Sequence, residues 1–182
     1  MRLSLGLTVL ATAACSLSSR ADGQGYPFSQ RGFVGQTVAF TEITIHYGRP
    51  VARGRRLFAD SGLVPFGAVW HPGADSATRI SFSHDVLVEG RQVKAGEYSV
   101  WFLPRANAPW TFILSEVAHV FHTPYPGADR DAYRFDVAPE HGAHMETLAF
   151  YFPVVLRDEA TLRMHWGETV LPLRIKAPFR PE

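Results

Sequence analysis

Apolar and polar residues alternate along most of the chain in short runs, which glycine, proline and other turn-forming residues separate. In residues 79–83 and 162–166 every second side chain is apolar, a period typical of a β-strand with one buried and one solvated face. Residues 98–103 form a strongly aromatic run that Pro104 ends, because proline cannot donate to a sheet ladder. We find no convincing amphipathic helix of useful length.

This pattern predicts about nine strands and no long helix, and therefore an all-β fold. The β-type runs lie at residues 38–47, 79–83, 86–88, 92–94, 98–103, 110–114, 133–137, 147–155, 161–166 and 170–175. The pair Glu89-Gly90 predicts a hairpin turn between the third and fourth runs. We expect a single antiparallel β-sandwich, jelly-roll-like, over residues 37–182, with an up-and-down barrel as the alternative.

The first 15 residues have the features of an export signal. Arg2 supplies a positive charge, residues 3–11 are apolar, and small residues precede Cys15. Two outcomes stay open: lipidation of Cys15, as in a bacterial lipoprotein, or cleavage at an Ala-x-Ala site followed by secretion. The protein is expected to be exported and to be periplasmic, anchored to the membrane by lipid, or otherwise secreted. Residues 16–36, rich in polar residues and glycine, are predicted to form a flexible tether.

Composition narrows the function classes. Apolar residues make up 46% of the chain and aromatic residues 13%, which supports a globular core. Cys15 is the only cysteine, so the mature domain has neither a disulfide nor a thiolate nucleophile. Without Arg2, 17 basic residues face 17 acidic ones, from totals of 18 and 17. This balance argues against nucleic acid as a partner and limits membrane contact to an N-terminal lipid anchor. The partner left is an unknown small molecule or an envelope protein.

One turn-rich segment concentrates residues with binding chemistry. It contains Tyr47-Gly48-Arg49-Pro50, Arg53-Gly54-Arg55, Leu63-Val64-Pro65-Phe66-Gly67 and the stretch at residues 70–78. Proline and glycine predict a type I turn at residues 64–67 and a type II turn around Pro72-Gly73, with a positive φ at Gly73. The candidates for ligand binding are Arg49, Arg55, Trp70, His71 and Thr78. The alternatives are a structural ion-pair network of Arg49, Arg55 and Asp60, and a core position for Trp70.

These motifs, together with Gly96-Glu97-Tyr98-Ser99, Trp110-Thr111-Phe112-Ile113-Leu114 and a last strand that reaches Trp166, resemble the bacterial domain of unknown function 2911 family. The resemblance covers residues 38–175. It implies a cell-envelope location and a β-rich domain, and it implies no established reaction. The chain departs from the usual family pattern at His71, Pro72, Asp75 and Ser76, where the family has arginine, threonine, asparagine and glutamate.

The eight histidines are the main enzyme-like feature. His119 and His122 are separated by two residues, as are His141 and His144, and with His71 the first pair are weak candidates for metal ligands. The His-Glu-x-x-His helix of metallohydrolases is absent, and solvated loop histidines are the alternative. A triad of Ser76 or Ser99 with His71 and Asp75 lacks the Gly-x-Ser-x-Gly elbow.

Our leading hypothesis from the sequence is a non-enzymatic binding or accessory domain of the cell envelope, without a cofactor. The second hypothesis is a metal-dependent hydrolase or isomerase that uses clustered histidines. The third is a purely structural envelope protein.

Overall fold

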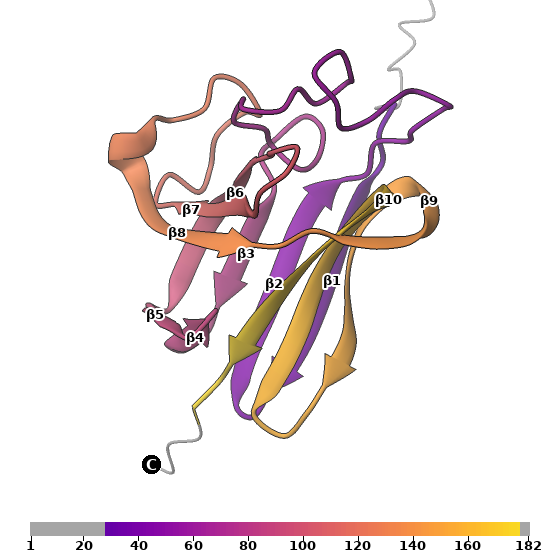
Figure 1. The fold of residues 1–182 in the computed structure, drawn as a ribbon. Helices are drawn as coiled ribbons and strands as arrows, with labels where there is room; N and C mark the ends of the chain where they lie inside the picture. Colours follow the sequence, from indigo (N-terminus) through magenta and orange to yellow (C-terminus); the bar gives the residue numbers. More distant parts are fainter. Residues whose placement is uncertain (1–27, 179–182) are drawn as a thin grey trace, which may run out of the picture.

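The computed structural model describes residues 28–178, and Figure 1 shows their arrangement. The predicted export signal and Cys15 lie outside the described residues. The described part contains ten strands and one short 3-10 helix, η1. Their bounds are β1 Arg31–Val38, β2 Thr41–Gly48, β3 Arg79–Phe82, β4 Val86–Val88, β5 Arg91–Val93, β6 Gly96–Leu103, β7 Trp110–Ser115, η1 Ala128–Arg130, β8 Asp131–Val137, β9 Glu140–Val155 and β10 Glu159–Lys176.

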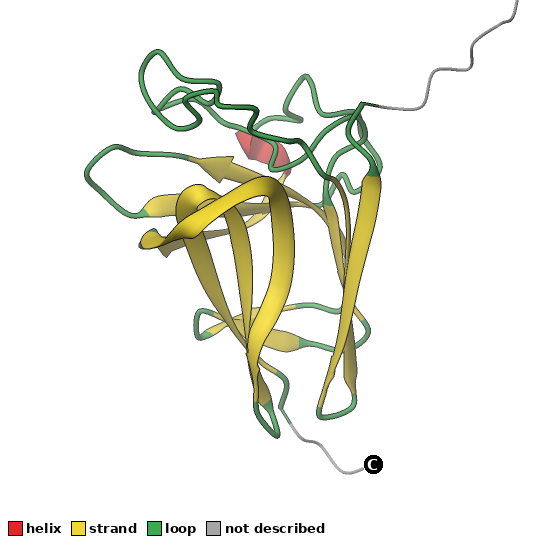
Figure 2. Ribbon diagram, turned by 90° about the vertical axis from the view of Figure 1, so that its right-hand side faces the viewer, coloured by secondary structure: helices red, strands yellow, loops and turns green. Residues whose placement is uncertain are grey.

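The strands form two antiparallel sheets, which confirms the predicted all-β sandwich. The six-stranded sheet has the order β1-β2-β3-β6-β7-β8, and the four-stranded sheet has the order β5-β4-β10-β9. The sheets remain separate layers rather than closing into one barrel, as the side view shows (Figure 2). Most connecting loops gather at one end of the sandwich, and the described chain ends at the other (Figures 1 and 2).

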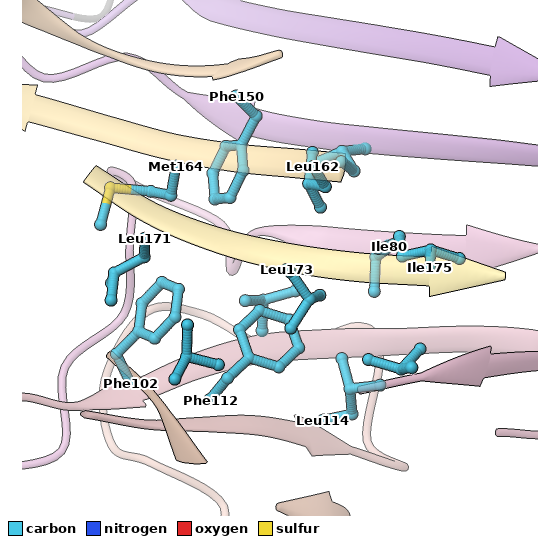
Figure 3. Close-up of a cluster of buried hydrophobic side chains, with 14 of the residues drawn as sticks. Ile80, Phe102, Phe112, Leu114, Phe150, Leu162, Met164, Leu171, Leu173 and Ile175 are labelled. Carbon is cyan, nitrogen blue, oxygen red and sulfur yellow. The ribbon is translucent and has the colours of Figure 1, made fainter. Parts of the chain in front are cut away.

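The core lies between the two sheets and follows the predicted alternation. In β2, Ile43, Ile45 and Tyr47 are buried, whereas the alternate residues Glu42 and His46 are exposed and Thr44 is half-buried. Figure 3 shows the two layers meeting. The six-stranded sheet contributes Ile80, Phe102, Phe112 and Leu114, and the four-stranded sheet contributes Phe150, Leu162, Met164, Leu171, Leu173 and Ile175.

Strand β1 corrects the predicted extent of the tether. Residues 31–36 were expected to belong to the flexible segment, but all eight residues of β1 pair with β2. Only Val38 of this strand is buried. The strand is therefore held mainly by its backbone ladder, with Val34 and Val38 as its apolar contacts to the core, which is why the hydrophobic pattern did not reveal it.

Strand β10 joins two predicted strands into one bent strand. The runs at residues 161–166 and 170–175 are its two halves, and the pairing with β9 shifts register around Gly167, whose φ is 59°. The bend brings the two ends of the strand together, and a hydrogen bond joins the residues that flank it: the Ala177 amide donates to the Asp158 carbonyl at 2.8 Å. The predicted hairpin between β4 and β5 is confirmed, with positive φ at Glu89 and Gly90.

Candidate functional site

The Tyr47-to-Pro50 motif forms a corner between the two sheets. After Gly48 the chain leaves the six-stranded sheet and pairs with β9 of the other one. Val51 forms an isolated bridge with Thr147, and the Leu148 amide donates to the Pro50 carbonyl at 2.9 Å. The motif therefore connects the two layers.

Both candidate arginines bind backbone carbonyls at this corner. Arg49 donates from Nε to the Leu148 carbonyl at 3.3 Å. Arg55 donates to the carbonyls of Ala52 and Val51 at 2.9 and 2.6 Å. Within residues 28–178, neither arginine belongs to an ion pair, so the hypothesised network with Asp60 is not what holds them.

Trp70 faces the core. Its backbone forms a bridge with Phe102, and its half-buried ring stacks on Trp166 with centroids 5.9 Å apart and planes 10° from parallel. Phe58 packs its edge against the same indole at 5.5 Å. Aromatic pairs at such distances stabilise a core beyond their buried area, so the structural alternative accounts for Trp70.

His71 packs against Trp101 and closes its own loop. Its Nε2 accepts a hydrogen bond from the Thr78 amide at 2.6 Å, and its side chain is 5% exposed. Burial, followed by the proximity of His122 and Arg31, lowers the pKa of His71 to about 3, so the ring is neutral. A neutral imidazole has one acceptor nitrogen, and the Thr78 amide already occupies it. His71 is thus not free to bind a metal or to act as a base.

The loop that His71 closes differs from the predicted type II turn. Gly73 does not have the positive φ that this turn requires; the positive φ falls on Asp75, at 62°. Gly73 instead permits a close approach, since a Cβ there would lie 2.7 Å from Oγ1 of Thr78. That hydroxyl donates to the Pro72 carbonyl at 2.8 Å. Trp70 packs in the core between the two sheets, whereas His71 packs against Trp101 on the outer face of the six-stranded sheet. The five candidate side chains therefore do not meet in one cavity.

The other histidines bind within their own surroundings. His122 uses its amide and Nδ1 on the Asp75 carbonyl, at 3.0 and 2.7 Å. His119 lies between Arg79 and Glu97, at 2.7 and 2.8 Å. Within residues 28–178 there is no group of three or more histidine, cysteine, aspartate or glutamate residues that could hold a metal ion.

The proposed nucleophiles are also engaged or misplaced. Ser99 donates to the Val117 carbonyl at 2.8 Å and accepts from the Trp101 indole at 2.9 Å. Ser76 pairs with Phe121, so the loop at residues 116–127 lies beside residues 75–77. This loop covers part of the outer face of the six-stranded sheet, where Val120 and Tyr125 pack against Trp101.

A cleft lies at the opposite end of the sandwich and was not predicted. Its volume is about 360 Å³. It is formed by β4, the turn that follows it, the end of β9 and both ends of β10. Its walls are the residues Leu87, Glu89, Gly90, Val154, Leu156, Glu159, Ala160, Thr161, Arg174, Ile175 and Lys176. None of the five candidate residues from the sequence contributes to it.

Exposed apolar side chains gather beside this cleft. Phe40 in the β1–β2 turn is 69% exposed, and Leu156 in the β9–β10 turn is 59% exposed. A backbone hydrogen bond from Ala39 to Arg157 joins the two turns. Val154 and Val155 add further exposed apolar surface. Contiguous apolar surface of this kind marks a site of interaction more often than scattered exposed residues do.

The charged groups of the cleft form two opposite pairs. Arg174 binds Glu89 at 2.8 Å, and Lys176 binds Glu159 at 3.0 Å. The hydrogen bond to Glu89 raises the pKa of Arg174, and the bond to Glu159, followed by that to Asp158, raises the pKa of Lys176. The cleft therefore offers apolar walls and charges of both signs, a combination suited to an amphipathic ligand. Its one sequence signal is the apolar run 154–156, which continues directly into a turn.

A model of the family described as protein of unknown function (DUF2911) matches residues 29–175. Comparisons with curated proteins and with solved structures found no match. No helix within residues 28–178 has the length and apolar character needed to cross a membrane.

Proposed function

This chain belongs to the DUF2911 family of proteins of unknown function, and we propose that it is a non-enzymatic binding or accessory domain of the bacterial cell envelope. The observation that carries the proposal is the cleft of about 360 Å³ at the end of the sandwich away from the motifs. The engaged state of His71 and Ser99 supports binding rather than catalysis, because neither side chain is free to react.

We propose an amphipathic small molecule as the ligand. Leu87, Val154 and Leu156 would contact its apolar part, and each buried methylene group would contribute about 0.8 kcal/mol. Arg174 and Lys176 would contact a charged end, after exchanging part of their present bonds to Glu89 and Glu159. These exchanges occur at an exposed rim, so they direct the ligand's orientation more than they add to its affinity.

The proposal is tested with three decyl probes that differ only in head group: decanoate, decylamine and a decyl sulfobetaine. Calorimetry on the purified mature protein should detect binding of at least one probe. Leu156→Ala should weaken that binding about fivefold, by about 1 kcal/mol. Leu63→Ala is the matched control, since Leu63 is also exposed but does not line the cleft. Absence of binding for every probe, or an equal loss in both variants, would contradict the proposal.

Export is the second part of the proposal. Residues 1–15 direct the chain out of the cytoplasm, and processing either lipidates Cys15 or cleaves at the Ala-x-Ala site. Mass spectrometry of the mature N-terminus, combined with cell fractionation, distinguishes the two. Full-length protein that stays in the cytoplasm would contradict export and leave the cleft measurement unaffected.

A further inference from the structure

The outer face of the six-stranded sheet has two different halves. The loop at residues 116–127 packs over Trp101 and Ile113 on β6 and β7. The outward side chains of β1, β2, β3 and the start of β6 remain exposed or half-buried. We call this second half the open face. Its central outward residues are Phe33, Gly35, Thr44, His46, Arg79, Ser81 and Glu97, and Arg31, Thr37 and Glu42 face outward at its edges.

An aromatic platform stands at one side of the open face. Phe33 is 72% exposed, and its ring stacks on that of His46, with centroids 5.8 Å apart and planes 23° from parallel. His46 fixes one side of the ring, so the other side stays available. Gly35, two residues further on, leaves a low point beside the platform, because a Cβ there would meet nothing closer than 3.6 Å.

Polar groups cross the centre of the open face in two rows, from strand to strand. One row runs from Phe33 through His46 to Arg79, and the next from Gly35 through Thr44 and Ser81 to Glu97. Four neighbouring strands span about 14 Å, at about 4.8 Å per spacing. The hydroxyls of Thr44 and Ser81 bond to each other at 2.5 Å and retain further hydrogen-bonding capacity toward solvent.

In the centre of the open face the charges compensate one another. Arg79 binds Glu97 at 3.2 Å and His119 at 2.7 Å, and His119 binds Glu97 at 2.8 Å. A ligand held over the centre of this face meets donors and acceptors in balance together with an ion pair, and the charged side chains of Arg31 and Glu42 lie at the edges of the face. This arrangement favours a neutral, hydroxyl-rich molecule over an anion or a cation.

We propose that the open face binds a neutral carbohydrate. A pyranose ring has an apolar C–H face, which would lie on Phe33, and a rim of hydroxyls, which would bond to Thr44, Ser81 and the Arg79–Glu97 pair. The site is independent of the cleft, which lies at one end of the sandwich and shares no residue with the open face.

The test is retention of the purified mature protein on three insoluble glycans: cellulose, chitin and peptidoglycan sacculi. Retention on at least one is expected, and Phe33→Ala should weaken it about tenfold, which corresponds to about 1.4 kcal/mol. Gly35→Leu should block the same surface, because a leucine there would occupy the low point. Phe33→Trp, which keeps an aromatic ring at this position, should retain the binding that Phe33→Ala loses. Circular dichroism confirms that each variant folds.

Phe40→Ala is the matched control, since Phe40 is 69% exposed yet lies beside the cleft. Cellobiose and chitobiose as soluble competitors distinguish a glucose from an amino-sugar ligand. Retention should change less than about twofold between about 0.05 and 0.5 M NaCl, because screening acts on charges. The proposal is overturned by no retention on any glycan, by an equal loss in Phe40→Ala, or by a steep salt dependence.

Discussion

The two ends of this sandwich differ in how their polar groups are used. At the motif end, residues 47–78, Arg49, Arg55, His71 and Thr78 bind backbone atoms of the same protein. At the cleft end, charged side chains pair at an exposed rim beside apolar residues that nothing in the described part covers. The turn-rich motifs at residues 47–78 therefore build the fold, and the cleft lies where the sequence offers only the apolar run 154–156 as a signal.

The difference follows from what each end must do. The motif end joins two sheets through a corner, and its loops approach each other closely, which requires particular glycines and internal partners for every buried polar group. The cleft end needs only two tight turns and apolar side chains.

The largest predicted effect tests the close packing of the motif end. A Cβ on Gly48 would lie 2.4 Å from the Ala74 carbonyl oxygen, so Gly48→Ala should destabilise the protein by about 3 kcal/mol. Gly35→Ala, with no contact closer than 3.6 Å, should change stability by less than about 1 kcal/mol. Urea denaturation measures both. Similar midpoints for the two variants would show that the 72–77 loop moves away easily.

The second prediction concerns pH. The pKa of His71 falls from its usual 6.5 to about 3 on folding, so the unfolded state takes up the proton first. As the pH is lowered from about 6.5 toward 3, this site should remove up to about 1.4 kcal/mol of stability per pH unit. His71→Gln keeps an acceptor for the Thr78 amide and should flatten the profile. Parallel profiles for the two proteins would contradict a neutral, buried His71.

The third prediction separates two adjacent arginines. Arg55 donates to the carbonyls of Ala52 and Val51, whereas the Arg56 side chain has no hydrogen bond or ion pair within residues 28–178. Arg55→Met should lower the free energy of unfolding by about 1 kcal/mol, and Arg56→Met by less than about 0.5 kcal/mol. If Arg55→Met instead abolished binding of a ligand while stability stayed unchanged, the ligand role predicted from the sequence would regain support.

The smallest predicted effect on stability belongs to the cleft end. Leu156→Ala should change the free energy of unfolding by less than about 0.5 kcal/mol, because the side chain is largely exposed. The same variant should weaken binding of the decyl probes about fivefold, as predicted above. A stability loss as large as that of Gly48→Ala would show that the cleft end is also scaffold.

Much of the fold followed from the sequence where strands have a buried and a solvated face. The runs at residues 98–103 and 110–114 coincide with β6 and β7 within two residues. Strand β1 was not predicted, because Gly32 and Gly35 interrupt the alternation of apolar and polar residues along it. The start of β9 also lacks buried residues, so His141 and His144 were taken for loop positions.

The candidate site was harder to predict because residue type does not show which way a side chain points. Trp70 and His71 are neighbours in sequence, yet one packs in the core and the other on the outer face. The cleft depends on the bend of β10 at Gly167, which brings residues 159–161 near residues 174–176. No local pattern encodes that approach.

The placement of β10 also sets an order of assembly. Within the described part, β10 is the only strand that links β4 and β5 to β9, so the four-stranded sheet is incomplete until residues 168–176 are available. The six-stranded sheet is complete once residue 137 is present. If the chain crosses a membrane from its N-terminus, as proposed above, the six-stranded sheet can form first. Its apolar face then stays uncovered until residues 168–176 have emerged and the four-stranded sheet can form. We expect that interval to be when the protein depends most on chaperones.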